Sequence, residues 1–233
     1  MSGIFESIDP RARILTIVAS ITIIASTAVA ELRPFPFYLV ITLLLIFASR
    51  ASGIYLTLRC LAASPFLLIA AALLAFQHGV TPQGLPAGVP AALSVLTKGY
   101  LAALLLALLT ATTPLAELLW ALREMKAPHA LSMILGMMYR YTSLLSEEYS
   151  RMERARDCRT VRPLGRSRIS IHGHQFGHLI LRSLDRADRV HAAMLSRGFD
   201  GGWPSMVRRE FTFRDAAFPV AVAVLFLVPR FYV

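Results

Sequence analysis

The chain has little charge and little cysteine for its length. Only 16% of the 233 residues are charged, against about a quarter in a typical soluble domain, and 56% are hydrophobic, above the usual ~45–50%. The two cysteines, Cys60 and Cys158, lie far apart and show neither disulfide nor metal-site spacing. This composition favours a membrane protein and excludes a disulfide framework, and it leaves each thiol as a small packing residue.

Common catalytic and nucleotide-binding motifs are also absent. The sequence contains no G-x-x-x-x-G-K-[ST] phosphate loop and no G-x-G-x-x-G dinucleotide motif. It contains neither a G-x-S-x-G nucleophile elbow nor an H-E-x-x-H zinc motif. We therefore expect a chain that is not an enzyme, does not hydrolyse ATP itself and holds no cofactor or metal of its own.

The positive charge is concentrated in one part of the chain. The formal net charge is +10, and 17 of the 24 Lys and Arg residues lie between Arg123 and Arg214. A low overall charge density with this clustering predicts a membrane protein that carries one basic domain. The basic region lacks interleaved stacking aromatics and is tethered to a membrane, so we expect no nucleic-acid partner.

Apolar runs predict an all-α polytopic membrane protein with about five transmembrane helices. The runs cover residues 14–30, 37–48, 61–76, 91–113 and a shorter 216–228. A helix needs about 20 such residues to cross a bilayer. The first run is not followed by a cleavage-site pattern, so we expect it to be retained as a membrane helix.

The distribution of arginine orients these segments in the lipid bilayer. Basic residues flank the N-terminus and the connection after the second run, namely Arg11, Arg13, Arg50 and Arg59. The connections 31–36 and 77–90 are nearly charge-balanced or uncharged, and the second is a predicted loop with three prolines and three glycines. The positive-inside rule then places the N-terminus and the basic region in the cytoplasm.

Helix-start and helix-stop signals divide the basic region. Thr113-Pro114 predicts the start of a short helix, and Pro128 predicts the start of a longer one that reaches Arg159. Residues 162–173 are predicted as a loop, and Gln175–Arg197 as a second long helix that Gly198 ends. We expect three parts: N-terminal transmembrane helices (1–113), a basic cytoplasmic domain (114–215) and a C-terminal transmembrane helix (216–233).

Part of the second long helix repeats part of the first. With an offset of 38 residues, Arg151–Thr160 aligns with Arg189–Gly198. The shared positions are a leading arginine, an alanine four residues later, and a small residue before a second arginine: Ala155 and Ala193, Cys158 and Ser196, Arg159 and Arg197. Positions i, i+4 and i+8 share a helical stripe, so each copy predicts a helix end with an arginine beside a small residue.

Two such ends suggest a protein that docks into two similar receptors. An arginine guanidinium is always charged and makes forked hydrogen bonds to carboxylates, and the small neighbour lets another backbone approach. The alternative is a solvated basic helix, or one lying on anionic lipid, where each charge contributes about 1 kcal/mol.

The two copies resemble a known pair of signatures. SRGFDG at the end of the second helix, together with MERARDCRT, looks like the paired Ala-Arg-Gly motifs of the transmembrane (T) component of energy-coupling factor (ECF) transporters, in particular the cobalt-type CbiQ branch. The stretches Asp9–Arg13, Thr112–Pro114 and Tyr139–Tyr141 fit the same family. The first copy departs from the pattern, because Thr160 replaces the glycine and Arg156 competes with Arg159 for the contact.

The resemblance implies a scaffold and energy-coupling subunit of an ECF-type ABC importer in the bacterial cytoplasmic membrane. Its partners would be a CbiO-like pair of ATPase subunits, which bind ATP and Mg²⁺, and a CbiM-like substrate-binding membrane subunit, with or without a CbiN-like chain. The implied substrate is cobalt, with nickel or a vitamin such as biotin as the alternative. The coupling residues would be Arg159, Arg197, Cys158, Ser196, Gly198, Ala155, Ala193 and Arg156.

Two other functional classes, a secondary permease and a membrane-embedded enzyme, fit the sequence less well. A stand-alone secondary permease would need polar or broken helices near mid-membrane, which the first, second and fourth runs hardly offer. A membrane-embedded enzyme would need clustered acids, for which Asp185 and Asp188 are the only weak candidates.

Two further features have both a functional and a structural interpretation. The histidines of an H-x-H-x3-H cluster, His172, His174 and His178, are potential metal ligands, but an Arg-rich loop makes a structural role the better interpretation. Lys98 lies inside the fourth run, where it either serves a function or reaches the interface with its long side chain.

Overall fold

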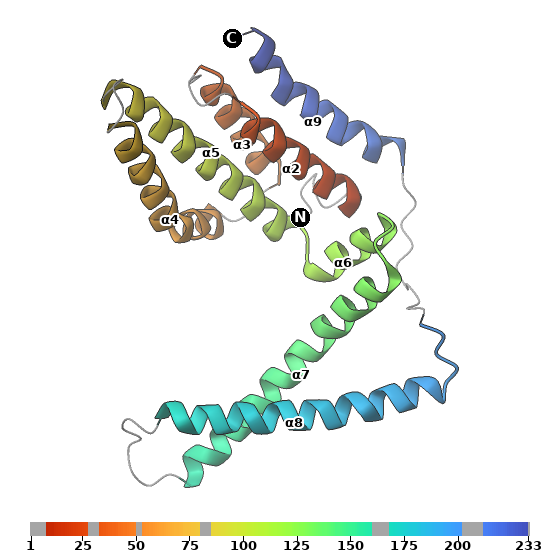
Figure 1. The fold of residues 1–233 in the computed structure, drawn as a ribbon. Helices are drawn as coiled ribbons and strands as arrows, with labels where there is room; N and C mark the ends of the chain where they lie inside the picture. Colours follow the sequence, from red (N-terminus) through yellow and green to blue (C-terminus); the bar gives the residue numbers. More distant parts are fainter. Residues whose placement is uncertain are drawn as a thin grey trace. The chain divides into compact units, whose positions relative to one another are not determined.

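The described residues form helices only. The computed structural model describes residues 8–27, 33–49, 53–79, 85–159, 168–201 and 212–232, and no strand occurs among them (Figure 1). The helices are α2 (Pro10–Ala25), α3 (Phe35–Ser49), α4 (Gly53–Gly79), α5 (Leu85–Thr112), α6 (Leu115–Glu124), α7 (His129–Arg159), α8 (Arg168–Leu195) and α9 (Phe213–Tyr232). The predicted all-α class is thus confirmed for this part of the chain.

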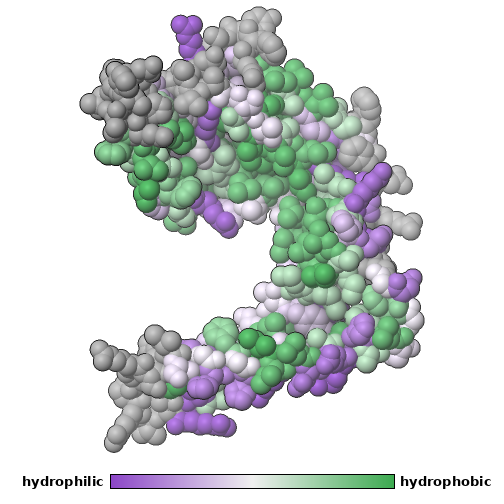
Figure 2. Space-filling model, viewed as in Figure 1, coloured by the Kyte–Doolittle hydropathy of each residue, from purple (hydrophilic) through white to green (hydrophobic). Residues whose placement is uncertain are grey.

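The chain forms two compact units. Unit 1 comprises Met1–Ala121 and Val207–Val233, and unit 2 comprises Leu122–Met206. The boundary between them falls within α6. Viewed as in Figure 1, apolar side chains gather over the helices of unit 1, whereas hydrophilic side chains are frequent along α7 and α8 (Figure 2).

The core of unit 1 lies where α2, α3, α5 and α9 pack together (Figure 1). Tyr38 of α3 is fully buried and stacks on Phe226 of α9, with ring centroids 5.7 Å apart. The cluster also takes two isoleucines from α2, four leucines from α5 and others: Ile17, Ile24, Ile41, Leu45, Leu101, Leu105, Leu108, Leu109, Val222 and Phe35. The C-terminal helix therefore belongs to the same bundle as the N-terminal ones.

Two helices are long and apolar enough to cross a membrane. The stretches are Gly53–Phe76 in α4 and Pro90–Thr112 in α5, while Phe35–Ser49 and Asp215–Pro229 are shorter apolar helices. Helix α4 packs on α5, and many of its other side chains are exposed apolar groups, such as Ile54, Phe66 and Phe76. Such a surface suits hydrocarbon, because a helix satisfies its own backbone hydrogen bonds there. The total of five spans stays a prediction.

Three predicted connections are shorter than expected. Arg59 lies inside α4, not before it, where its guanidinium sits 5.2 Å from the ring of Tyr55 one turn earlier. The predicted loop 77–90 is helical at both ends, with residues 80–84 outside the described part. The predicted loop 162–173 is also wrong in its second half, because α8 begins at Arg168. Contacts of this first stretch of α8 with α7 stabilise the early start.

The ends of α2 are held by side chains. Asp9 caps the first turn, with its Oδ1 accepting from the backbone N–H of Arg11 at 2.9 Å. At the other end, Nζ of Lys98 in α5 donates to the carbonyl oxygen of Thr27 at 2.5 Å and to that of Ala25 at 3.5 Å. A cation at the carbonyl end of a helix is favourable. Lys98 therefore has a structural role, as a cap for α2.

Gly99 marks the closest approach of α4 and α5. A Cβ atom at this position would overlap the end of the Leu67 side chain. We expect Gly99→Ile to force the helices apart, at a cost of about 1–3 kcal/mol. The thermal melting temperature of the detergent-purified protein should fall.

The control is Gly136→Ala in α7, where an added Cβ meets open space. This change should keep or raise the melting temperature, since alanine is the better helix former by about 1 kcal/mol. A Gly99→Ile protein that melts like its parent would contradict the close approach.

Candidate functional site

Helices α7 and α8 of unit 2 run in opposite directions and cross (Figure 1). Near the end of α7, Tyr149 stacks on Phe176, with ring centroids 5.2 Å apart, and its hydroxyl lies 3.1 Å from Nδ1 of His172. An ion pair follows, with Nη1 of Arg182 donating to Oε1 of Glu148 at 2.7 Å. These contacts join the last three turns of α7 to the first half of α8.

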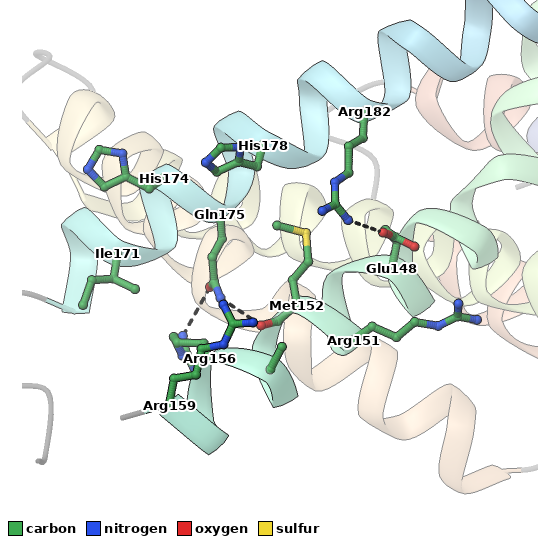
Figure 3. A pocket seen from close by; sticks show the side chains of 11 residues that line it. Glu148, Arg151, Met152, Arg156, Arg159, Ile171, His174, Gln175, His178 and Arg182 are labelled. Carbon is green, nitrogen blue, oxygen red and sulfur yellow. Dashed lines mark hydrogen bonds and ion pairs between the residues drawn. The ribbon is translucent and has the colours of Figure 1, made fainter. Parts of the chain in front are cut away.

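Arg156 lies between the two helices. Its Nη2 donates to Oδ1 of Asp157 at 2.8 Å, and its Nη1 donates to Oε1 of Gln175 at 3.3 Å. The hydrogen bond to Asp157 raises the pKa of the Arg156 guanidinium above its usual value. Gln175 is buried and donates in turn to the carbonyl oxygen of Met152 at 3.3 Å. Figure 3 shows Gln175 pointing from α8 toward Arg156. Arg156 therefore holds α7 to α8.

Arg159 is placed differently from Arg156. It is the last residue of α7 and is exposed, as are Ala155 and Cys158 of the same copy. It lines an open groove of about 640 Å³ between the two helices (Figure 3). The groove is basic, with the side chains of Glu148, Arg151, Met152, Ala155, Arg156, Arg159, Ile171, His174, Gln175, His178 and Arg182 along it. Arg156 is thus bonded between the helices, whereas Arg159 is exposed at the end of α7.

The contribution of α8 to this groove was missed in the sequence. His174, His178 and Arg182 are spaced by four residues and so share one stripe of α8. That spacing was the available signal. The histidines do not converge on a metal site, because His172 turns to Tyr149 while the other two line the groove. No group of three or more potential ligands that could hold a metal occurs in the described ranges.

The second copy ends α8 with a regular stop. Gly198 has φ +77°, which favours glycine, and the predicted left-handed stop is confirmed. The N–H of Phe199 donates to the carbonyl of Met194 at 3.1 Å and that of Gly198 to Leu195 at 3.0 Å, the two bonds of a Schellman motif. Arg197 is the C-cap residue, and Arg197, Ser196 and Ala193 are all exposed.

The two motif arginines lie at opposite ends of the helix pair. Arg159 shares its groove with Ile171 near the start of α8, and Arg197 follows Met194 near its end. The 23 residues between these positions correspond to about 35 Å of helix. Beside the second end lies a smaller apolar groove of about 300 Å³, lined by Met137, Tyr141, Leu145, Ser183, Arg186, Ala187, Val190 and Met194. Each end therefore carries a motif arginine, but a basic groove lies at the first end and an apolar groove beside the second.

Gly198 determines how Arg197 is presented. We expect Gly198→Val to unwind the last turn of α8, because a left-handed conformation costs an L-residue about 1–2 kcal/mol. Backbone amides of residues 194–199 should exchange faster in hydrogen–deuterium exchange.

Gly177→Ala is the matched control on the same helix, since an added Cβ there also meets open space but the backbone is helical. Exchange at residues 194–199 should not change in this variant. Equal protection of the last turn in Gly198→Val and the parent would show that the glycine is not needed for the stop.

Comparison with known proteins gives a family. The CbiQ model, described as cobalt transport protein, matches residues 3–208. The cobalt transport protein CbiQ of Rhodobacter capsulatus is 30% identical over 161 residues, which cover 69% of this chain and 64% of that protein. The nickel permease LarQ of Lactiplantibacillus plantarum is 33% identical over 104 residues, or 45% of this chain and 38% of that one. An uncharacterized protein of Methanocaldococcus jannaschii, MJ1089, is 33% identical over 90 residues, or 39% and 34%.

The match thus spans between about a third and two thirds of the length of these relatives. The family match itself covers most of this chain, including α2 to α8 and both copies of the repeated motif. Two of these relatives carry the names of transport proteins. The chain belongs to the CbiQ family of cobalt transport proteins.

Proposed function

We propose that this chain is the energy-coupling membrane subunit of an ECF-type ATP-driven importer. The observation that carries the proposal is the placement of Arg159 and Arg197, two exposed arginines on helix ends about 35 Å apart in one helix pair. This separation is about the diameter of a small domain, so each end has room for its own ATPase subunit. ATP and Mg²⁺ would be bound by those CbiO-like subunits.

The chemistry of each end suits an acidic receptor. A guanidinium binds carboxylates through forked, charge-assisted hydrogen bonds, and a desolvated arginine at the centre of an interface contributes about 2–4 kcal/mol. Cys158 and Ser196 precede the arginines and are exposed, so a partner backbone can come close. Ala155 and Ala193 extend the same narrow stripe one turn earlier, and Gly198 ends the second helix immediately after Arg197.

Unit 1 would serve as the membrane scaffold. We propose five spans, with the N-terminus in the bacterial cytoplasm and the basic region 114–215 on that side. The exposed apolar side chains of α4, such as Phe66 and Phe76, favour contact of this helix with lipid or with a membrane partner. That partner would be a CbiM-like substrate-binding subunit, with or without a CbiN-like chain.

Cobalt is the first substrate to test, because the family model and the Rhodobacter relative carry that name. Nickel is the second, because the Lactiplantibacillus relative is called a nickel permease. A vitamin such as biotin is the remaining alternative. Uptake of labelled Co²⁺, Ni²⁺ and biotin by cells that express the complete transporter would separate the three.

Charge reversal tests the docking role. Arg159→Glu and Arg197→Glu should each weaken ATPase binding about 30- to 1,000-fold, which corresponds to about 2–4 kcal/mol, because the new carboxylate would repel an acidic receptor. Co-purification of the ATPase from membranes and metal uptake should both be lost, while the chain still inserts into the membrane.

Arg154→Glu is the matched control, because it makes the same charge change at an exposed position of α7 that is not one of the shared positions of the repeat. It should retain most of the ATPase binding. Normal uptake and normal ATPase co-purification in Arg197→Glu would refute the proposed coupling role.

A further inference from the structure

The first turn of α2 carries charged side chains into the interior of unit 1. Arg13 is 1% exposed and Asp9 is 4% exposed, next to the apolar cluster of α2, α5 and α9. A buried charge persists only where hydrogen bonds and opposite charges replace its water. The partners of these two residues therefore show what the first turn holds in place.

Arg13 bonds to the junction between α5 and α6. Its Nη1 donates to the carbonyl oxygen of Thr112 at 2.7 Å and to Oγ1 of Thr113 at 3.4 Å. The same nitrogen lies 3.7 Å from Oε2 of Glu117, in the first turn of α6. The Nε of Arg13 donates to the carbonyl oxygen of Ile8 at 3.1 Å. One guanidinium thus joins the start of α2, the end of α5 and the start of α6.

Arg11 reaches the same short helix from the same turn. Its guanidinium lies 4.7 Å from the ring centroid of Trp120, a distance at which a cation is attracted to an indole face. Glu117 and Trp120 are three residues apart, so they lie on one face of α6. Two arginines of the first turn of α2 therefore hold two successive turns of α6.

Asp9 connects the start of α9 to this arrangement. Its backbone N–H donates to Oδ1 of Asp215 at 2.9 Å, and Oδ2 of Asp215 accepts from the N–H of Thr212 at 3.0 Å. Asp9 itself caps α2 and lies 3.8 Å from the Nε of Arg11. The segment Asp9–Arg13 thus contacts α5, α6 and α9 at one place.

Helix α6 leads directly into the helix pair that carries the motif arginines. It follows Pro114, where the helical path of α5 is broken, and it ends in a turn with Lys126 at φ +66° before α7 begins at His129. A ten-residue helix that begins after such a break would pivot unless side chains fixed it. Leu118 packs against the apolar cluster, Trp120 is buried, and Arg11 and Arg13 supply the directional contacts.

We infer that Asp9–Arg13 is a clamp that fixes the start of α6 to α2, α5 and α9 within unit 1, with Arg11 and Arg13 as positioning residues for energy coupling. The inference rests on the proposed function, in which force enters through Arg159 and Arg197. The clamp transmits that force from α6 to α2, α5 and α9. Without the clamp, α6 would rotate at Thr113-Pro114 and the force would not reach these helices. Loosening the clamp uncouples ATP hydrolysis from transport without releasing the ATPase.

The test measures metal transported per ATP hydrolysed by the complete transporter in proteoliposomes. Arg13→Lys keeps the charge but cannot make the same set of directional bonds, and Glu117→Gln removes the ion pair at a position that is one-third exposed. We expect each to lower the ratio about tenfold, with the ATPase still bound. Arg123→Lys, on the last turn of α6, is the control and should leave the ratio unchanged.

A purely structural role predicts a different result, because fewer transporters would assemble but each would keep the parental ratio. If Arg13→Lys does not assemble, Glu117→Gln and Trp120→Phe decide the question. An unchanged ratio in the variants that assemble overturns the clamp. An Arg197→Glu transporter measured in parallel separates the two ideas, since loss of the ATPase there supports the docking role whatever the clamp variants do.

Discussion

The guanidinium of Arg13 at the end of α5 is the interaction on which much of this structure depends. A cation this deeply buried must replace its water with protein groups, and the groups that do so come from three helices. Because those helices are α2, α5 and α6, one side chain brings the N-terminus of the chain to the point where the apolar bundle ends. Asp9 adds the start of α9 through Asp215, so the first turns of α2 and α9 lie together there.

Unit 2 depends on a different balance of forces. Its two long helices bury little, and polar pairs such as Arg156 with Gln175 and Arg182 with Glu148 hold them together. An ion pair with an exposed arginine, such as Arg182 with Glu148, contributes little, so the crossing is supported by the stacked Tyr149 and Phe176 as well. A weakly buried helix pair with arginines at its ends suits a part that binds partners more than one that forms a core.

The repeated motif could be predicted from the sequence, whereas the groove beside its first copy and the early start of α8 could not. The 38-residue repeat, the glycine stop and the helix start at Thr113-Pro114 are local signals, which follow from capping and backbone conformation. The early start of α8 is not local, because the added stretch contacts α7 through His172, which lies within hydrogen-bond distance of Tyr149 and Arg156. The groove beside Arg159 was missed for the same reason, since it exists only where the two helices cross.

The sequence by itself determined the all-α class, the apolar helices, the basic region and the pair of arginine-bearing helix ends. These properties follow from composition, periodicity and short motifs, which act within a few residues of one another. Only the tertiary structure decided that Arg156 is engaged while Arg159 is presented, that Lys98 caps α2, and that Arg13 joins three helices. Each of these depends on atoms far apart in the chain, and burial alone determines which polar side chain must find a partner.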